Sequence, residues 1–332
     1  MSYLLKPLHI GALELRNRLV MPPMATAKAS PQGEVNQALL DYYAEKSQGG
    51  YISLIIIEHS FIHETGKASA GQLSSASDRM IDGLRALAKK IHQNGSKTVL
   101  QINHAGSSAG EDIIGTTPVG PSAVVNPRKG GDSLPRELTR PEINQVVQYF
   151  QDAARRSKEA GFDGVEIHSA HGYLLNQFFS PLTNRRTDEY GGNVHNRIRI
   201  HLEIIEAVRG VVGQDFPVLL RLGACDYREG GVTSEDSLIA AKEFAKAGID
   251  CLDVSGGFSG YQVPGLSGQG YFAPLTEALK RVITIPVILT GGITDSFAAE
   301  QLLTEGKADL IGVGRAILAD SQWAERAIKS GV

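Results

Sequence analysis

The stretch Ile52-Ser53-Leu54-Ile55-Ile56-Ile57 decides the fold, because it is apolar and β-branched almost throughout and does not alternate with polar residues. Such a continuous run is typical of a parallel strand that is buried on both faces. Seven further runs of this kind occupy residues 19–21, 98–102, 164–167, 218–222, 251–254, 287–289 and 310–313. Amphipathic stretches lie between them, and in residues 198–212 the apolar side chains form one stripe at helical spacing. The sequence therefore predicts alternating strands and helices.

Two helix starts support this alternation. Thr139 is followed three residues later by Glu142, and Thr233 by Asp236, which is the spacing of a capping box. Eight strand-then-helix units over about 300 residues fit a TIM (β/α)8 barrel. An open doubly wound sheet is the alternative, but it would need a G-x-G-x-x-G fingerprint after an early strand, and the sequence has none.

Two segments lie outside a minimal barrel. Residues 4–18 precede the first strand, and we predict that they form a hairpin that closes the bottom of the barrel. Residues 104–140 are rich in Gly, Pro and Ser and form a long loop between the third strand and its helix, a kind of loop that usually has a function. Because no linker divides the sequence, we expect one domain over residues 1–332.

The composition excludes several classes of protein. A formal net charge of −3 predicts neither nucleic acid nor an anionic membrane as a partner. The only two cysteines, Cys225 and Cys251, exclude a disulfide framework and a cysteine-ligated cluster. The N-terminus has no signal-peptide pattern and no apolar run is long enough to span a bilayer, so we expect a cytoplasmic enzyme.

In a TIM barrel the active site lies at the carboxyl ends of the strands, and the last two strands end in glycine. Gly291 and Gly292 follow the seventh strand, and Gly314 and Arg315 follow the eighth. Glycines let backbone N–H groups approach a phosphate, and an arginine adds a charge-assisted contact. The alternative is that these glycines only make tight turns. Two consecutive pairs with an arginine favour phosphate binding.

Gln101 and Arg221 end the third and fifth strands inside otherwise apolar runs. A buried guanidinium needs a partner, and a buried amide needs its hydrogen bonds satisfied. One interpretation is an internal salt bridge in the mouth of the barrel. The other is a cofactor ring with carbonyl and imide edges, whose reduced, anionic form a nearby positive charge would favour.

His168 and His171 stand at the end of the fourth strand, three residues apart. They can converge only if the chain turns after His168, and Gly172 favours such a turn. Two imidazoles could then donate to one substrate oxygen, with the Tyr173 phenol as a proton donor nearby. A metal site is the alternative. It would need further ligands, and we expect the nearest, Glu166, to face away.

These residues resemble the signature of the old yellow enzyme family of FMN-dependent ene-reductases. The strand-four motif VEIHSAHGYLLNQFFSP (165–181) is long and specific, and it continues into NRRTDEYGG (184–192). The opening residues 6–8 and 16–18, the segments around Gln101 and Arg221, and the stretch 312–315 resemble the family as well. The resemblance covers essentially the whole chain, in order.

The resemblance implies FMN bound noncovalently on top of the barrel and NADH or NADPH as the reductant. His168 and His171 would bind the carbonyl oxygen of a small α,β-unsaturated substrate, and Tyr173 would give a proton to its α-carbon. The implied flavin-binding residues are Pro23, Met24, Ala25, Thr26, His59, Gln101, Arg221, Gly291, Gly292, Gly314 and Arg315. A homo-oligomer is also compatible with the family, whose members are often dimers or tetramers.

The sequence departs from the family pattern at several positions. Ala25 stands where a flavin-tuning Cys is often found, and Thr26 could bond the flavin instead. Ala27 replaces a substrate-facing Tyr of some relatives, and His59 replaces a small residue. The larger members of the family carry an iron–sulfur half, and this sequence lacks the cysteines that such a cluster needs. We therefore expect electrons to come directly from a soluble donor such as a nicotinamide.

Three other functions remain open from the sequence. A flavin barrel of the same kind could act on other substrates, by amine or steroid-like dehydrogenation. A flavin-holding subunit with little turnover would not need Tyr173. A metal-dependent barrel hydrolase would be colourless and would bind zinc.

Overall fold

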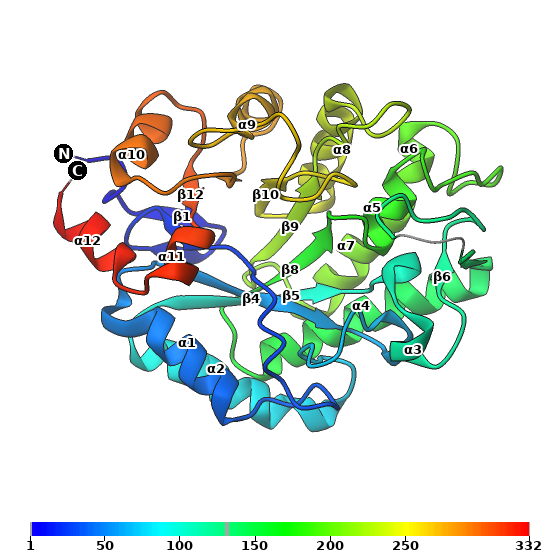
Figure 1. Cartoon of the computed structure of the whole chain (residues 1–332), viewed down its shortest axis with the longest axis horizontal. Helices are drawn as coiled ribbons and strands as arrows, with labels where there is room; N and C mark the ends of the chain where they lie inside the picture. Colours follow the sequence, from blue (N-terminus) through cyan, green and yellow to red (C-terminus); the bar gives the residue numbers. More distant parts are fainter. Residues whose placement is uncertain (1, 130–132, 332) are drawn as a thin grey trace.

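The computed structural model describes residues 2–129 and 133–331. Its centre is a closed barrel of eight parallel strands, each paired with the next along the chain (Figure 1). The strands are β3 (Leu19–Met21), β4 (Leu54–Phe61), β5 (Lys97–Asn103), β8 (Gly164–Ser169), β9 (Val218–Gly223), β10 (Cys251–Ser255), β11 (Val287–Leu289) and β12 (Leu310–Gly312). The predicted TIM barrel is confirmed. The single domain over 1–332 stays a prediction, and its first and last residues lie outside the described ones.

Helices form a ring outside the barrel (Figure 1). They are α1 (Gln37–Ser47), α2 (Ile81–Gln93), α4 (Arg140–Glu159), α7 (Arg199–Val212), α8 (Ser234–Ala247), α9 (Ala273–Lys280), α10 (Ser296–Thr304), α11 (Arg315–Ala319) and α12 (Trp323–Lys329). Both predicted helix starts are present. The Asp236 N–H donates to Thr233 Oγ1 at 3.2 Å, and the backbone N–H of Thr139 donates to Glu142 Oε2 at 2.8 Å. These contacts satisfy donors that a helix leaves free at its first turn.

The N-terminal segment closes the bottom of the barrel, as predicted. β1 (Leu8–Ile10) and β2 (Leu13–Leu15) form an antiparallel hairpin. Its buried side chains Ile10, Leu13 and Leu15 join one apolar cluster, the plug, with side chains from the barrel strands. The strand residues of the plug are Val20, Leu54, Ile56, Val99, Leu219, Cys251, Ile288 and Leu310. The lower interior is therefore filled with apolar side chains, and the polar side chains inside the barrel lie nearer the carboxyl ends of the strands.

The predicted loop after the third barrel strand has structure of its own, although residues 130–132 lie outside the described ones. It contains η4 (Gly106–Ser108), α3 (Glu111–Ile114), and β6 (Val119–Gly120) paired with β7 (Arg136–Glu137). The remaining short elements are η1 (Gln48–Gly50), η2 (Glu64–Gly66), η3 (Asp78–Met80), α5 (Leu174–Phe179) and α6 (Val194–Arg197). Of these, α5 directly follows Tyr173 and positions the site.

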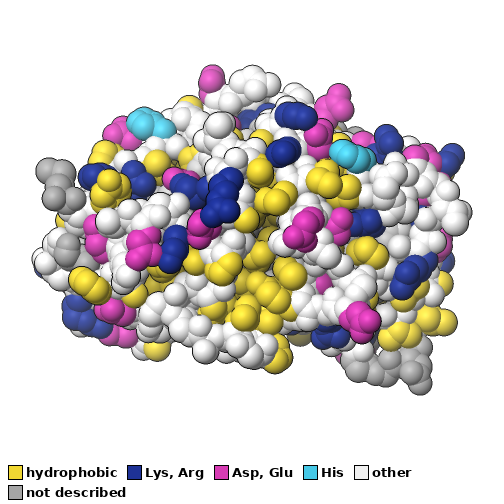
Figure 2. Space-filling model, turned by 90° about the horizontal axis from the view of Figure 1, so that it is seen from above, with side chains coloured by type: hydrophobic (Ala, Val, Ile, Leu, Met, Phe, Trp, Pro, Cys, Tyr) yellow, Lys and Arg dark blue, Asp and Glu magenta, His cyan; other side chains and the backbone are white. Residues whose placement is uncertain are grey.

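The outer surface carries mixed charges. Figure 2 shows hydrophobic side chains gathered in the middle of one face, with basic and acidic side chains scattered around them. Large apolar side chains that remain exposed include Phe297 of α10 and Ile239 of α8. Within the described part of the chain, no helix has the length and apolar character needed to cross a membrane.

The plug gives a first test. Leu15 is fully buried in it, whereas Glu14, the preceding residue on the same strand, is exposed. We expect Leu15→Ala to lower the free energy of unfolding by about 2–5 kcal/mol, because it removes buried methyl groups and leaves a cavity. Glu14→Ala is the matched control and should change it by less than about 0.5 kcal/mol. Urea unfolding measures both, and similar losses in the two variants would contradict the role of the plug.

Candidate active site

β8 brings two polar side chains to the inside of the barrel. Glu166 pairs in register with Gln101 of β5, and His168 with Arg221 of β9. Since side chains two residues apart on a strand share a face, Glu166 and His168 both point inward. The expectation that Glu166 faces away was therefore wrong.

The chain turns after β8, as the sequence predicted. The strand continues to Ser169, and the chain turns at His171 and Gly172, whose φ angles are 61° and 75°. The Tyr173 N–H donates to Ala170 O at 3.2 Å and closes the turn. Such left-handed conformations are unusual for a residue with a side chain, so the surrounding structure must hold His171 in place.

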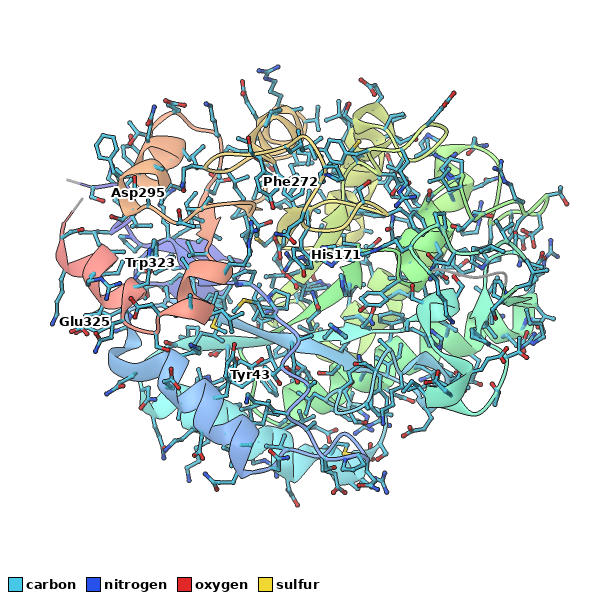
Figure 3. The ribbon with its side chains drawn as sticks, in the orientation of Figure 1. Tyr43, His171, Phe272, Asp295, Trp323 and Glu325 are labelled. Carbon is cyan, nitrogen blue, oxygen red and sulfur yellow. The ribbon has the colours of Figure 1, made fainter. Side chains whose placement is uncertain are left out.

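The turn gathers the aromatic rings of the site. The ring centre of His168 lies 5.1 Å from that of His171 and 5.2 Å from that of Tyr173, both edge-on. The His59 ring, from β4, lies 5.3 Å from Tyr173. Figure 3 labels His171 near the centre of the molecule. The structure thus brings together the three residues that sequence analysis named at this strand end, and adds His59.

Hydrogen bonds limit what each histidine can do. His171 Nε2 lies 2.8 Å from Ser255 Oγ at the end of β10, so its Nδ1 is the nitrogen left for a ligand. His168 Nδ1 is buried and has no hydrogen-bond partner among the described residues. No local pattern in the sequence links Ser255 to His171.

Burial determines the protonation states of the site. It lowers the pKa of His168 and of His171 well below the ordinary value, and the nearby cation Arg221 lowers both further. Burial raises the pKa of Tyr173 above its ordinary value. At neutral pH the site therefore contains two neutral imidazoles and a protonated phenol, which together can donate three hydrogen bonds without a positive charge.

Three side chains hold the turn through one carbonyl. Gly172 O accepts from Ser108 Oγ at 2.7 Å, from Asn126 Nδ2 at 3.2 Å and from Gln177 Nε2 at 2.7 Å. Ser108 and Asn126 belong to the long loop, and Gln177 belongs to α5. The long loop therefore has a structural role, because it holds the turn that follows β8. Sequence analysis recognised the length of the loop but not these residues.

Arg128 of the same loop also reaches the turn. Its Nη1 donates to His171 O at 2.7 Å, and its side chain is exposed. The ring of Tyr261, which is 54% exposed, lies 6.0 Å from that of His171. Sequence analysis missed both residues, because each lies in a loop whose fold no local pattern predicts.

A β-bulge shapes the neighbouring strand end. Ile57 pairs with Leu100 and Ser60 with Ile102, so Glu58 and His59 together face the single residue Gln101. Bulges commonly re-aim side chains beside active sites. Here, Glu58 Oε2 accepts the Thr26 N–H at 2.6 Å, and His59 Nδ1 lies 2.6 Å from Gln72 Nε2. Burial lowers the pKa of His59 to about 4, so this ring is neutral as well.

The segment after β3 lies across the barrel mouth. Pro23, Met24 and Thr26 are partly buried, while Ala25 and Ala27 are exposed. A Cβ placed on Gly314 would lie 3.3 Å from Met24 Sδ, so the ends of β3 and β12 meet here. Ala27 has a φ of 55°, a left-handed conformation that is strained for alanine.

The two glycine pairs lie around one tyrosine. Gly291 and Gly292 have φ angles of 108° and 72°, and a Cβ on either would lie 2.8 Å from the Tyr271 ring. Arg315 Nη2 lies 3.3 Å from Tyr271 Oη. The turn geometry thus requires glycine at both positions, which agrees with the alternative interpretation that these glycines make tight turns. Yet the backbone N–H groups of Gly291, Gly292 and Gly314 donate to no acceptor in residues 2–129 and 133–331, so they are also available to a ligand.

Gln101 and Arg221 have partners inside the barrel. Gln101 Nε2 donates to Glu166 Oε1 at 2.7 Å, and Arg221 Nη1 lies 3.1 Å from Asp253 Oδ2. The internal salt bridge that sequence analysis left open is therefore present. Arg221 Nε and Nη1 nevertheless lack a well-aligned hydrogen bond among the described residues. In the same part of the chain, no group of three His, Cys, Asp or Glu side chains is arranged to hold a metal ion.

Glu58 gives a test based on pH. Burial raises its pKa from 4.5 to about 7, so the folded protein keeps a proton that the unfolded chain loses at lower pH. The resulting stability is fully present below about pH 4.5 and is lost as the pH rises through about 7. Glu58→Gln cannot titrate, so relative to it the wild type should lose roughly 3 kcal/mol between about pH 4.5 and 7.5.

Urea unfolding of both proteins at about pH 5 and about pH 8 measures this difference. The exposed Glu34→Gln is the matched control, for which we expect no such change with pH. A constant difference between wild type and Glu58→Gln at the two pH values would show that the buried carboxyl does not titrate as described.

Comparison with known proteins identifies relatives over nearly the whole chain. An NADH oxidase of Thermoanaerobacter brockii is 43% identical over 326 residues, which are 96% of this chain but 49% of that protein. An NADPH dehydrogenase of Geobacillus sp. (strain WCH70) is 39% identical over 99% of this chain and 94% of its own length. The chain thus spans about half the length of the first relative and nearly all of the second.

Solved structures agree with this result. A 2-naphthoyl-CoA reductase in complex with 2-naphthoyl-CoA superimposes with a TM-score of 0.93 at 29% identity, over 99% of this chain and 52% of that one. An old yellow enzyme homologue from Zymomonas mobilis gives 0.86 at 28% identity, over 99% and 93%. The family model described as the NADH:flavin oxidoreductase / NADH oxidase family matches residues 3–331. Together with the barrel and its strand-four turn, these matches confirm the resemblance noted in the sequence: the chain belongs to this family, which includes the old yellow enzymes.

Proposed function

We propose that the protein is an FMN-dependent NAD(P)H oxidoreductase that reduces the C=C bond of small α,β-unsaturated carbonyl compounds. The observation that carries this proposal is the convergence of His171 and Tyr173 on His168 at the carboxyl end of the barrel, where their ring centres lie 5.1 Å and 5.2 Å from that of His168. Two neutral N–H donors and one phenol suit a substrate with a carbonyl oxygen and a neighbouring carbon that needs a proton.

The residues around this trio fit FMN, the cofactor of the family. Arg221 has N–H groups without a well-aligned partner, and the strand-end glycines have free backbone N–H groups, so the two regions suit an imide edge and a phosphate. The proposed FMN-binding residues are Pro23, Met24, Ala25, Thr26, His59, Gln101, Arg221, Gly291, Gly292, Gly314 and Arg315. His59 also lies against Tyr173, so its ring would border the substrate as well.

When bound, FMN supplies hydride transfer from NADH or NADPH to the β-carbon of the substrate. The chain provides the rest. His168 and His171 donate N–H hydrogen bonds to the carbonyl oxygen of the substrate. These bonds draw electron density from the alkene. Tyr173 keeps its proton because burial raises its pKa, and it delivers that proton to the α-carbon. The Gly172 carbonyl brace holds all three groups in position.

The names of the relatives support a nicotinamide-dependent activity, since they are an NADH oxidase and an NADPH dehydrogenase. They do not define the oxidised substrate. The alternative from sequence analysis, dehydrogenation of amine or steroid-like substrates on the same barrel, therefore provides the comparison substrates for the test. The homo-oligomer expected from the family remains a prediction, which light scattering of the purified protein can test.

The proposed function is tested first by the visible spectrum of the purified protein. We expect flavin absorbance that bleaches anaerobically on addition of NADH or NADPH and returns on addition of an enone, with the saturated ketone as product. A protein that stays colourless after reconstitution with FMN would refute the proposal. Bleaching of the oxidised flavin by an amine or a saturated steroid without any nicotinamide, together with no return of colour with enones, would favour the alternative.

Tyr173→Phe tests the proton donor. Losing the phenol should slow reoxidation by an enone about 100-fold or more, the usual contribution of a positioned acid. Reduction by the nicotinamide should change little, because that step needs no proton from Tyr173. Stopped-flow absorbance follows both half-reactions. Tyr51→Phe, which alters a tyrosine bonded to Glu325 outside the site, is the control. Equal loss in both half-reactions would contradict the assigned role.

A further inference from the structure

A layer of buried polar side chains lies inside the barrel below the catalytic trio. It comprises Gln101 of β5, Glu166 of β8, Arg221 of β9 and Asp253 of β10, and none is more than 4% exposed. We call these four residues the polar layer. Three of them stand two positions along their strands from members of the plug, so the layer rests directly on apolar side chains. His168, two residues beyond Glu166, covers it from above.

The polar layer consists of two pairs. Gln101 donates to Glu166 at 2.7 Å, and the Arg221 guanidinium lies 3.1 Å from the Asp253 carboxylate. The second oxygen of Glu166 and both oxygens of Asp253 lack a hydrogen bond among the described residues. Buried polar atoms without partners are costly, so their retention here needs an explanation beyond packing.

The charges of the layer do not balance if both acids ionise. Two carboxylates would face one guanidinium, which would leave a buried negative charge without a counterion. Arg128, the other cation near the site, is exposed and donates to His171 O, so solvent screens its charge from the layer. The remaining titratable groups around the layer supply no positive charge. Burial lowers the pKa values of His59, His168 and His171 and raises that of the Cys251 thiol, so all four are neutral. One of the two carboxyls must therefore hold a proton.

Geometry indicates which one. Asp253 lies beside the guanidinium, which stabilises its ionised form, whereas Glu166 lies beside a neutral amide. Burial and the charge of Asp253 both raise the pKa of Glu166 well above its ordinary value. Burial also raises the pKa of Asp253, to about 6, but Arg221 opposes this shift. At neutral pH the layer then has no net charge.

We propose that Glu166 and Asp253 are positioning residues of the flavin site, with Asp253 ionised against Arg221 and Glu166 protonated against Gln101. The inference rests on the proposed function, since it concerns the charge below the FMN ring. Asp253 would offset part of the positive charge that Arg221 presents to the ring, and so would lower the reduction potential. Glu166 would accept one N–H of Gln101 and leave its amide oxygen for the imide N–H of the ring, without adding charge.

The test measures the reduction potential of FMN bound to the protein. The shift of this potential gives the change in the ratio of the protein's affinities for reduced and oxidised FMN. Asp253→Asn removes the counter-charge and should raise the ratio of reduced to oxidised affinity about tenfold, which equals a rise of about 30 mV in the two-electron potential. Glu166→Gln replaces one neutral acceptor by another and should change this ratio by less than about threefold. Xanthine oxidase-coupled dye titration gives the potential directly.

Asp226→Asn is the matched control. Asp226 is a buried carboxylate outside the polar layer, where it accepts from Ser180 Oγ and from the N–H groups of Val232 and Phe258. Its loss should lower stability but leave the affinity ratio unchanged. A purely structural role for Asp253 would give this same result. Equal potential shifts in Glu166→Gln and Asp253→Asn would show that Glu166 is charged and would overturn the assignment.

A second measurement does not depend on FMN or on the folding of Asp253→Asn. At about pH 8.5 the infrared spectrum of the wild type should keep a carboxylic-acid C=O band that Glu166→Gln lacks, because most other carboxyls are ionised there. Identical spectra would overturn the protonated state of Glu166. Failure of the proposed function appears differently, as a wild-type protein that binds no FMN while this band is still present.

Discussion

The carbonyl of Gly172 is the point on which the site depends. A chain that reaches the end of β8 would normally carry His171 away from His168, and two consecutive left-handed residues reverse it. That conformation costs free energy, which the three donors on Gly172 O offset from two separate parts of the chain. Without these donors we expect the turn to relax and the rings of His171 and Tyr173 to move away from that of His168.

The interior of the barrel below this turn has two regions, one above the other along the barrel axis. Its lower interior is filled by the plug, which needs no polar partner, while its upper interior carries Gln101, Glu166, Arg221 and Asp253. On β5, β9 and β10, the side chain two residues beyond a plug residue belongs to the polar layer. The apolar base thus fixes the height of these polar groups, while burial above them keeps His168 and His171 neutral.

Much of this organisation could be predicted from the sequence. Continuous apolar runs determined every barrel strand to within a few residues, and the residues after each run identified the strand ends. The bulge at Glu58 and His59 could not be predicted, because it depends on pairing with β5 and leaves no periodic signal. Nor could Asn126, Ser255 or Arg128, whose contacts join segments far apart in the chain. The predicted orientation of Glu166 was wrong, although the two-residue period of a strand would have placed its side chain on the same face as that of His168.

Two positions at which the sequence was expected to depart from the family pattern, Ala25 and Ala27, lie just after β3. Both are exposed, and the backbone between them is held at Thr26. Glu58 holds the Thr26 N–H at 2.6 Å, and Thr26 Oγ1 accepts from the Lys28 N–H at 3.2 Å. The buried carboxyl of Glu58 thus fixes the backbone after β3, just as the bonds to the Gly172 carbonyl fix the turn after β8. In both places, one hydrogen-bond acceptor fixes the backbone that follows a barrel strand.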